Sequence, residues 1–159
     1  VQGPGRAGAV RAGTSRQSTG RCGEDLAATY LEDIGWQVLE RNWRPDHGLR
    51  GELDIIALEP GHAHREPGSE SVTDPAQGRA GPRLVIVEVK TRSSLRQGPP
   101  AAAVDARKVA RLRALAAAWA STHETPPHAG MRLDVVSILL RDARPALLRH
   151  HRAVDASWG

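Results

Sequence analysis

The chain has 159 residues, 40% of them hydrophobic, which predicts a single domain with its own buried core. No apolar run approaches the roughly 18 residues that a membrane span needs, and the basic N-terminus lacks the apolar segment of a secretory signal, so no membrane partner is expected. The single cysteine, Cys22, excludes an internal disulfide and favours a reducing compartment. These features together predict a cytoplasmic protein.

The net charge of +4 equals the charge of the first 22 residues. Residues 1–22 hold four arginines and no acid, whereas the other 18 basic side chains are balanced by 18 acidic ones. The overall charge is therefore no argument for nucleic-acid binding. Residues 90–113 nevertheless carry seven basic side chains against one acidic side chain, which indicates an anionic partner for that segment.

The N-terminal part of the chain changes character near residue 23. Residues 1–22 are rich in Gly, Arg, Ser and Ala without periodicity, which predicts a disordered basic tail, either simply solvated or acting as an accessory phosphate-binding arm. Residues 24–35 have the apolar spacing of a helix that Gly35 would end. Glu24 lies on the flank of that apolar stripe, where it either favours the helix dipole or belongs to a site.

Two predicted strands follow, at residues 36–43 and 51–59, and a third at residues 84–92. The intervening residues 60–83 contain repeated Pro and Gly, which predicts a flexible insertion at the tip of a hairpin. Its His62 and His64 are interpreted as solvated, because a metal site would need two more ligands nearby.

The C-terminal half predicts a long Ala-rich helix over residues 101–121, a strand over 131–140 and an edge strand over 146–154. Lys108 falls within the apolar stripe of that helix, so it either snorkels outward or overhangs a polar site. Asp134 is either a third buried acid or the ion-pair partner of an arginine such as Arg132. The folded domain is thus expected to span residues 23–154, followed by a short tail at 155–159.

The strand Leu-Val-Ile-Val-Glu-Val-Lys-Thr-Arg at residues 84–92 is the most informative segment. Its first six residues are apolar except Glu88, and strand alternation places Glu88 and Lys90 on one face. Asp54 in the preceding strand is likewise in line with core residues. A buried carboxylate costs several kcal/mol unless it is paired or binds a metal.

A hairpin would bring Asp54 and Glu88 within about 5 Å, where two carboxylates repel unless a cation lies between them. Oxygen ligands suit Mg²⁺. Lys90 would reach the same metal-bound water, and an amine near a cation can lose its proton. A buried ion pair of these acids with Lys90, without catalysis, is the open alternative.

Asp54 followed by Glu88-Val89-Lys90 resembles the D…ExK core of the restriction-endonuclease-like (PD-(D/E)xK) nucleases. Five blocks in order resemble more closely the YraN-like family of predicted endonucleases, which is related to archaeal Holliday-junction resolvases. These blocks are GEDLAATYLEDIGWQVLERNWR, GELDIIAL, LVIVEVKTR, GPPAAAVDARKVARL and RLDVVSI. They cover about Gly20 to Leu140 without the insertion.

The resemblance implies an α/β fold, with a mixed β-sheet flanked by α-helices, and a catalytic set of Asp54, Glu88 and Lys90. It implies Mg²⁺ as the cofactor, with Mn²⁺ as a substitute, and the carbonyl of Val89 as a further ligand. Glu24 matches the helix glutamate that helps to hold the metal or its water. Glu52, Arg92 and Lys108 match family positions without an assigned role.

The expected function is a metal-dependent nuclease that hydrolyses phosphodiester bonds of duplex, branched or damaged DNA, as a monomer or a homodimer. The residues expected to bind phosphate are Arg92, Arg107, Lys108 and Arg111. An aromatic content of 3% argues against a single-strand reader that stacks bases. The alternatives are a non-catalytic nucleic-acid-binding or partner-binding module on the same fold, and a purely structural interaction protein.

Overall fold

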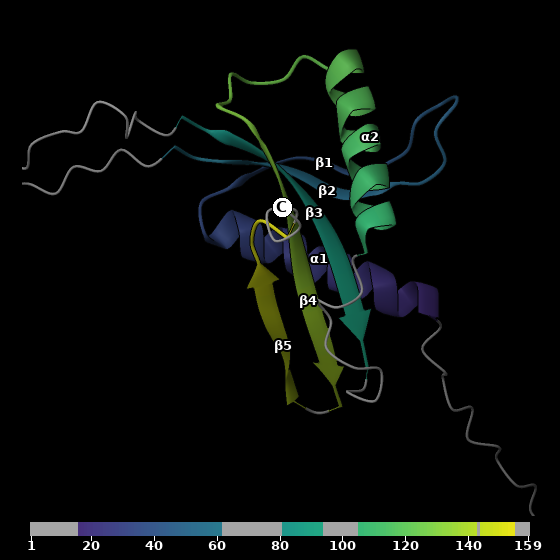
Figure 1. Ribbon diagram of the computed structural model, residues 1–159. Coiled ribbons are helices and arrows are strands. Elements are labelled where there is room, and N and C mark those ends of the chain that lie inside the picture. Colours follow the sequence, from purple (N-terminus) through teal and green to yellow (C-terminus); the bar gives the residue numbers. More distant parts are fainter. Residues whose placement is uncertain (1–15, 62–80, 94–104, 143, 155–159) are drawn as a thin grey trace, which may run out of the picture.

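The computed structural model describes residues 16–61, 81–93, 105–142 and 144–154. The elements in chain order are α1 (Arg16–Asp33), β1 (Gln37–Trp43), β2 (Leu53–Glu59), β3 (Arg83–Arg92), α2 (Ala106–Thr122), β4 (Met131–Arg141) and β5 (Arg144–His151). The strands form one mixed sheet in the order β1-β2-β3-β4-β5 (Figure 1). β3 and β4 are parallel and joined through α2, whereas every other neighbouring pair is antiparallel.

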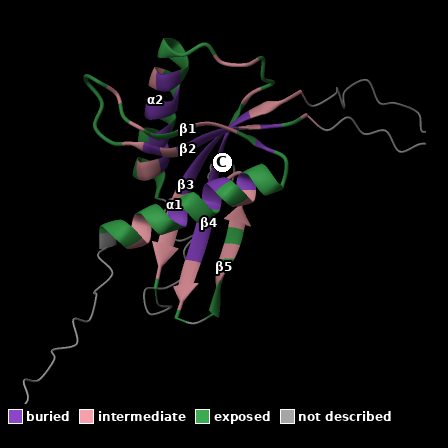
Figure 2. Ribbon diagram, turned by 180° about the vertical axis from the view of Figure 1, so that it is seen from behind, coloured by how far each residue is buried: buried purple, intermediate pink, exposed green. Residues whose placement is uncertain are grey.

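The two helices cover opposite faces of the sheet, as the views from the two sides show (Figures 1 and 2). The face under α2 is an apolar cluster that includes Ile56, Ile86, Leu112 and Trp119. The face under α1 is a second cluster of β-branched residues with Ala27, Ala28 and Leu31. β3 and β4 lie at the centre and contribute to both clusters, which explains their nearly continuous apolar sequences.

The predicted α/β fold, with a mixed sheet flanked by helices, is confirmed. The predicted hairpin is also confirmed, because β2 and β3 pair from Ile55–Val87 to Glu59–Arg83. Arg83 therefore belongs to β3 rather than to the insertion. Most of that insertion, with His62 and His64, lies outside the described residues, as do residues 1–15, the start of the predicted second helix and the tail at 155–159.

The prediction that residues 1–22 form a disordered tail is wrong for residues 16–22, because α1 begins at Arg16. The first turns of α1 are mostly exposed and carry no apolar stripe, so sequence periodicity could not reveal them. The helix ends where predicted: Gly35 has a φ of 86°, and the N–H of Trp36 donates to the carbonyl of Leu31 over 2.9 Å. Ile34, which directly follows α1, is 40% exposed.

Gly23 is the point at which α1 approaches the end of β3 most closely. A Cβ atom at this position would lie 2.8 Å from Cβ of Thr91 and 1.7 Å from its Oγ1.

Among the residues that the structure describes, no helix is both long and apolar enough to cross a membrane.

We expect Gly23→Ala to lower the free energy of unfolding by about 1–3 kcal/mol, because the added methyl group forces α1 away from Thr91. Gly20→Ala is the matched control in the same helix, since a Cβ there meets nothing within 4 Å. It should instead stabilise the protein by up to about 1 kcal/mol through helix propensity. Urea denaturation measures both variants, and equal effects of the two would contradict the proposed close approach.

Candidate functional site

The carboxylates of Asp54 and Glu88 are brought together by the base of the β2–β3 hairpin. Asp54 precedes Ile55 and Glu88 follows Val87 by one position, so the two acids lie just beyond this antiparallel pair, on the face that packs under α2. The backbone N–H of Val89 donates to Oδ2 of Asp54 over 2.7 Å. The hydrogen bond fixes one oxygen of Asp54 beside the neighbouring strand.

Glu88 is the most deeply buried member of the site, with 4% of its surface exposed. Its Oε1 accepts a hydrogen bond of 2.7 Å from Nζ of Lys90 and lies 3.1 Å from Nζ of Lys108. The two lysines of the chain therefore meet at one oxygen atom. Lys90 comes from the same strand, whereas Lys108 comes from the first turn of α2.

The N-terminus of α2 is fixed by Asp105, whose Oδ1 accepts from the N–H of Lys108 over 2.7 Å. The cap fixes the position of Lys108 in the first turn of α2, next to the buried Val109 and one turn before the buried Leu112. Of the two interpretations of Lys108, the structure supports the one in which the helix start overhangs a polar site.

The pKa of the Asp54 carboxyl is raised from 3.8 to about 7, chiefly by burial. The negative charges of Glu88 and Glu24 add to the rise. The N–H of Val89 and the ammonium of Lys108 act in the opposite direction, because they favour the ionised carboxylate. Burial and the two neighbouring carboxylates therefore outweigh the hydrogen bond from Val89 and the charge of Lys108.

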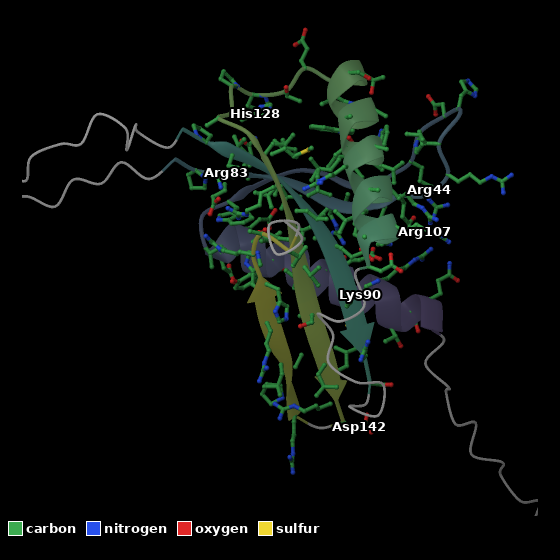
Figure 3. All side chains as sticks on the ribbon, viewed as in Figure 1. Arg44, Arg83, Lys90, Arg107, His128 and Asp142 are labelled. Atoms are coloured by element: carbon green, nitrogen blue, oxygen red, sulfur yellow. The ribbon has the colours of Figure 1, made fainter. Side chains whose placement is uncertain are left out.

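A pocket of about 350 Å³ is lined by Asp54, Glu88 and Lys108 of this cluster, and also by Glu24, Glu52, Val89 and Arg111. Lys90 contacts Glu88 but does not line the pocket. The pocket therefore joins three elements predicted separately, namely α1, the hairpin and α2. Arg107 is exposed beside it at the start of α2, and Arg92 lies half-buried at the end of β3. Figure 3 shows Lys90, Arg107 and Arg44 on the same side of the molecule.

The donor set fits a hard divalent cation, because it consists of carboxylate oxygens with an excess of negative charge. Within the described ranges, no group of three or more His, Cys, Asp or Glu side chains forms a metal cluster. A metal here would therefore depend on Asp54 and Glu88, with a backbone oxygen and water completing its shell. Such a shell is typical of Mg²⁺, which keeps several waters in protein sites.

Asp134 belongs to a different cluster, on the face under α1. It is fully buried and binds Arg132 through both oxygens, at 2.7 and 2.8 Å, so both interpretations of this residue hold. Arg132 also contacts Glu59, and His150 approaches Asp134 at 2.8 Å. Burial alone would raise the pKa of Asp134, but hydrogen bonds from His150 and Arg132 outweigh it and hold the pKa below its usual range.

Comparison of the chain with known protein families and relatives identifies its family. The profile of Uncharacterised protein family UPF0102 matches residues 23–138. The chain belongs to this family, which is the YraN-like family indicated by its sequence blocks. A UPF0102 protein of Beutenbergia cavernae is 42% identical over 88% of this chain and 98% of its own length. A UPF0102 protein of Streptomyces coelicolor is 39% identical over 88% of this chain and 90% of its own length.

We expect Asp54→Asn to stabilise the protein above pH 7 by up to a few kcal/mol, because one pKa unit corresponds to about 1.4 kcal/mol. The folded-state pKa of about 7 exceeds the ordinary 3.8, so the ionised carboxylate destabilises the folded domain and stability falls as pH rises through this window. The difference between variant and wild type should therefore shrink toward pH 4.

Urea denaturation from pH 5 to pH 8 measures this effect. Asp46→Asn, which removes an exposed acid from the turn after β1, is the matched control and should show no such trend. A constant difference between Asp54→Asn and wild type over this range would contradict the raised pKa.

Proposed function

We propose that the protein is a divalent-metal-dependent nuclease that hydrolyses phosphodiester bonds of duplex or branched DNA. The observation that carries the proposal is the raised pKa of Asp54 beside buried Glu88, in a polar pocket bordered by basic side chains. Two carboxylates held this close favour binding of a cation. The arginines at the pocket rim favour an anionic substrate.

Asp54, Glu88 and the carbonyl of Val89 would hold the metal, Mg²⁺ or Mn²⁺, with Glu24 holding a coordinated water. Such an ion supplies a water of lowered pKa and stabilises charge on the phosphate. The hydrogen bond from the Val89 N–H to Asp54 keeps that carboxylate oriented. Burial of Glu88 limits competing contacts with solvent.

Lys90 is the residue proposed to act on the attacking water. Its Nζ is held 2.7 Å from Oε1 of Glu88, so the amine stays beside the proposed metal ligands. Lys108 shares that oxygen at 3.1 Å and therefore balances charge within the pocket as well as facing substrate. Arg107 and Arg111, both exposed on α2, are proposed to bind the phosphates, together with Arg92 at the end of β3.

Cleavage of labelled duplex, nicked and four-way DNA in Mg²⁺ or Mn²⁺ tests the proposal. We expect Asp54→Ala and Lys90→Ala each to lower the rate by at least about 100-fold, because each removes a group that prepares the attacking water. Arg149→Ala, on exposed β5, is the control and should cleave normally. Unchanged cleavage by both site variants would refute the assignment.

A non-catalytic nucleic-acid-binding module is the second candidate. The observation that favours it is that two lysines already neutralise Oε1 of Glu88. In that case the cluster would be a buried ion-pair network that shapes a binding surface.

Calorimetric titration with Mn²⁺ and Mg²⁺ separates the two candidates. A nuclease should bind metal through Asp54, so wild type should show a heat of binding that Asp54→Asn loses. Binding of DNA without any metal site in wild type would favour the binding module instead.

A further inference from the structure

A second polar groove, of about 720 Å³, adjoins the carboxylate pocket. Glu24 and Glu52 line both cavities, so the groove begins where the pocket ends. Its other lining residues come from α1, the end of β1 and the turn that follows: Gln17, Gly20, Arg21, Asp25, Arg41, Asn42 and Arg44. The groove is large enough for a ligand, and its charged and amide side chains favour a polar one.

We propose that this groove binds the phosphodiester backbone of the nucleic-acid arm that leads away from the scissile phosphate. Arg21, Arg41 and Arg44 are its phosphate contacts. The inference rests on the proposed function, because a nucleic-acid arm would lie along the groove only if the adjoining pocket held the phosphate to be cut.

Arg41 and Arg44 are held in place by carboxylates at the groove wall. Nη2 of Arg41 lies 2.6 Å from Oδ1 of Asp25, and Nε of Arg44 lies 2.8 Å from Oε2 of Glu52. A guanidinium has five N–H donors, so each pair leaves donors for a phosphate oxygen. Side chains that are already ordered also lose less conformational freedom when they bind a ligand.

Arg21 is exposed on α1 and makes no ion pair within the described part of the chain. It precedes Glu24 by three residues and therefore shares its side of the helix. Because α1 begins at Arg16, a regular helix rather than a tail presents this arginine to the groove. Part of the basic N-terminal segment thus becomes a fixed phosphate contact.

Among the described residues, none fills the groove next to Gly20. A Cβ added at Gly20 would meet nothing within 4 Å, so the helix surface is open at this point. Asn42, at the end of β1, also lines the groove and has a φ of 54°, a left-handed conformation that asparagine adopts more readily than most residues. The open helix surface at Gly20 leaves room for an extended polar chain in this part of the groove.

Two variants test the proposal by independent means, both in the cleavage-deficient parent Asp54→Asn. Arg21→Gln/Arg44→Gln removes two charges, which should lower affinity for a fluorescein-labelled four-way DNA by about tenfold or more. It should also reduce the slope of log affinity against log salt by about 2, one for each lost phosphate contact. Gly20→Leu fills the groove without a charge change and should lower affinity by a similar factor.

The controls are Arg149→Gln, an exposed arginine on β5, and Thr29→Leu, an exposed position on the opposite side of α1 from Gly20. Fluorescence anisotropy over a series of salt concentrations gives affinity and slope, and thermal melting verifies that each variant is folded. Loss of affinity in both groove variants, with both controls unchanged, would support the groove.

The remaining outcomes separate this inference from the proposed function. Unchanged affinity and salt dependence in both groove variants would refute DNA binding by the groove and would leave the proposed nuclease activity unaffected. Groove variants that lose affinity, in a protein whose wild type cleaves no DNA, would refute the nuclease and keep the groove. A parent that binds no DNA at low salt would overturn both.

Discussion

The pairing of β2 with β3 is the constraint on which the candidate site depends. Asp54 and Glu88 are 34 positions apart in the sequence, yet they lie next to the Ile55–Val87 pair on adjacent antiparallel strands. The pairing places two carboxylates on one face of a sheet, where burial and their mutual repulsion raise the pKa of Asp54 to about 7. The apolar clusters on both faces of the sheet keep this unfavourable arrangement in place.

The parallel crossover from β3 to β4 adds the second half of the pocket. α2 must cover the sheet face that carries Ile56 and Ile86, and its capped start therefore lies over the ends of the carboxylate-bearing strands. The contact of Lys108 with Glu88 follows from this geometry, as does the exposure of Arg107 and Arg111 beside the pocket. The basic segment that begins at Lys90 thus lies around the site rather than along an unrelated surface.

The opposite face shows how the same residue types serve stability instead. Asp134 is fully buried like a site acid, but Arg132 and His150 neutralise it and its pKa is lowered rather than raised. Asp134 on β4 and Asp54 on β2, the two strands that flank β3, therefore differ in their electrostatic surroundings. Asp134 is paired with Arg132 and His150, whereas burial and the nearby carboxylates disfavour the ionised form of Asp54, which a bound cation would favour.

The sequence by itself determined the strands, the hairpin, the family and the association of Asp54 with Glu88 and Lys90, because alternation and apolar runs report burial directly. The tertiary structure alone decided that Lys108 binds Glu88 and that Asp134 pairs with Arg132 on the other face. It also decided that α1 extends to Arg16 and borders a groove, because exposed helical turns leave no apolar pattern. Contacts between distant elements depend on how the helices pack on the sheet, which local sequence patterns do not encode.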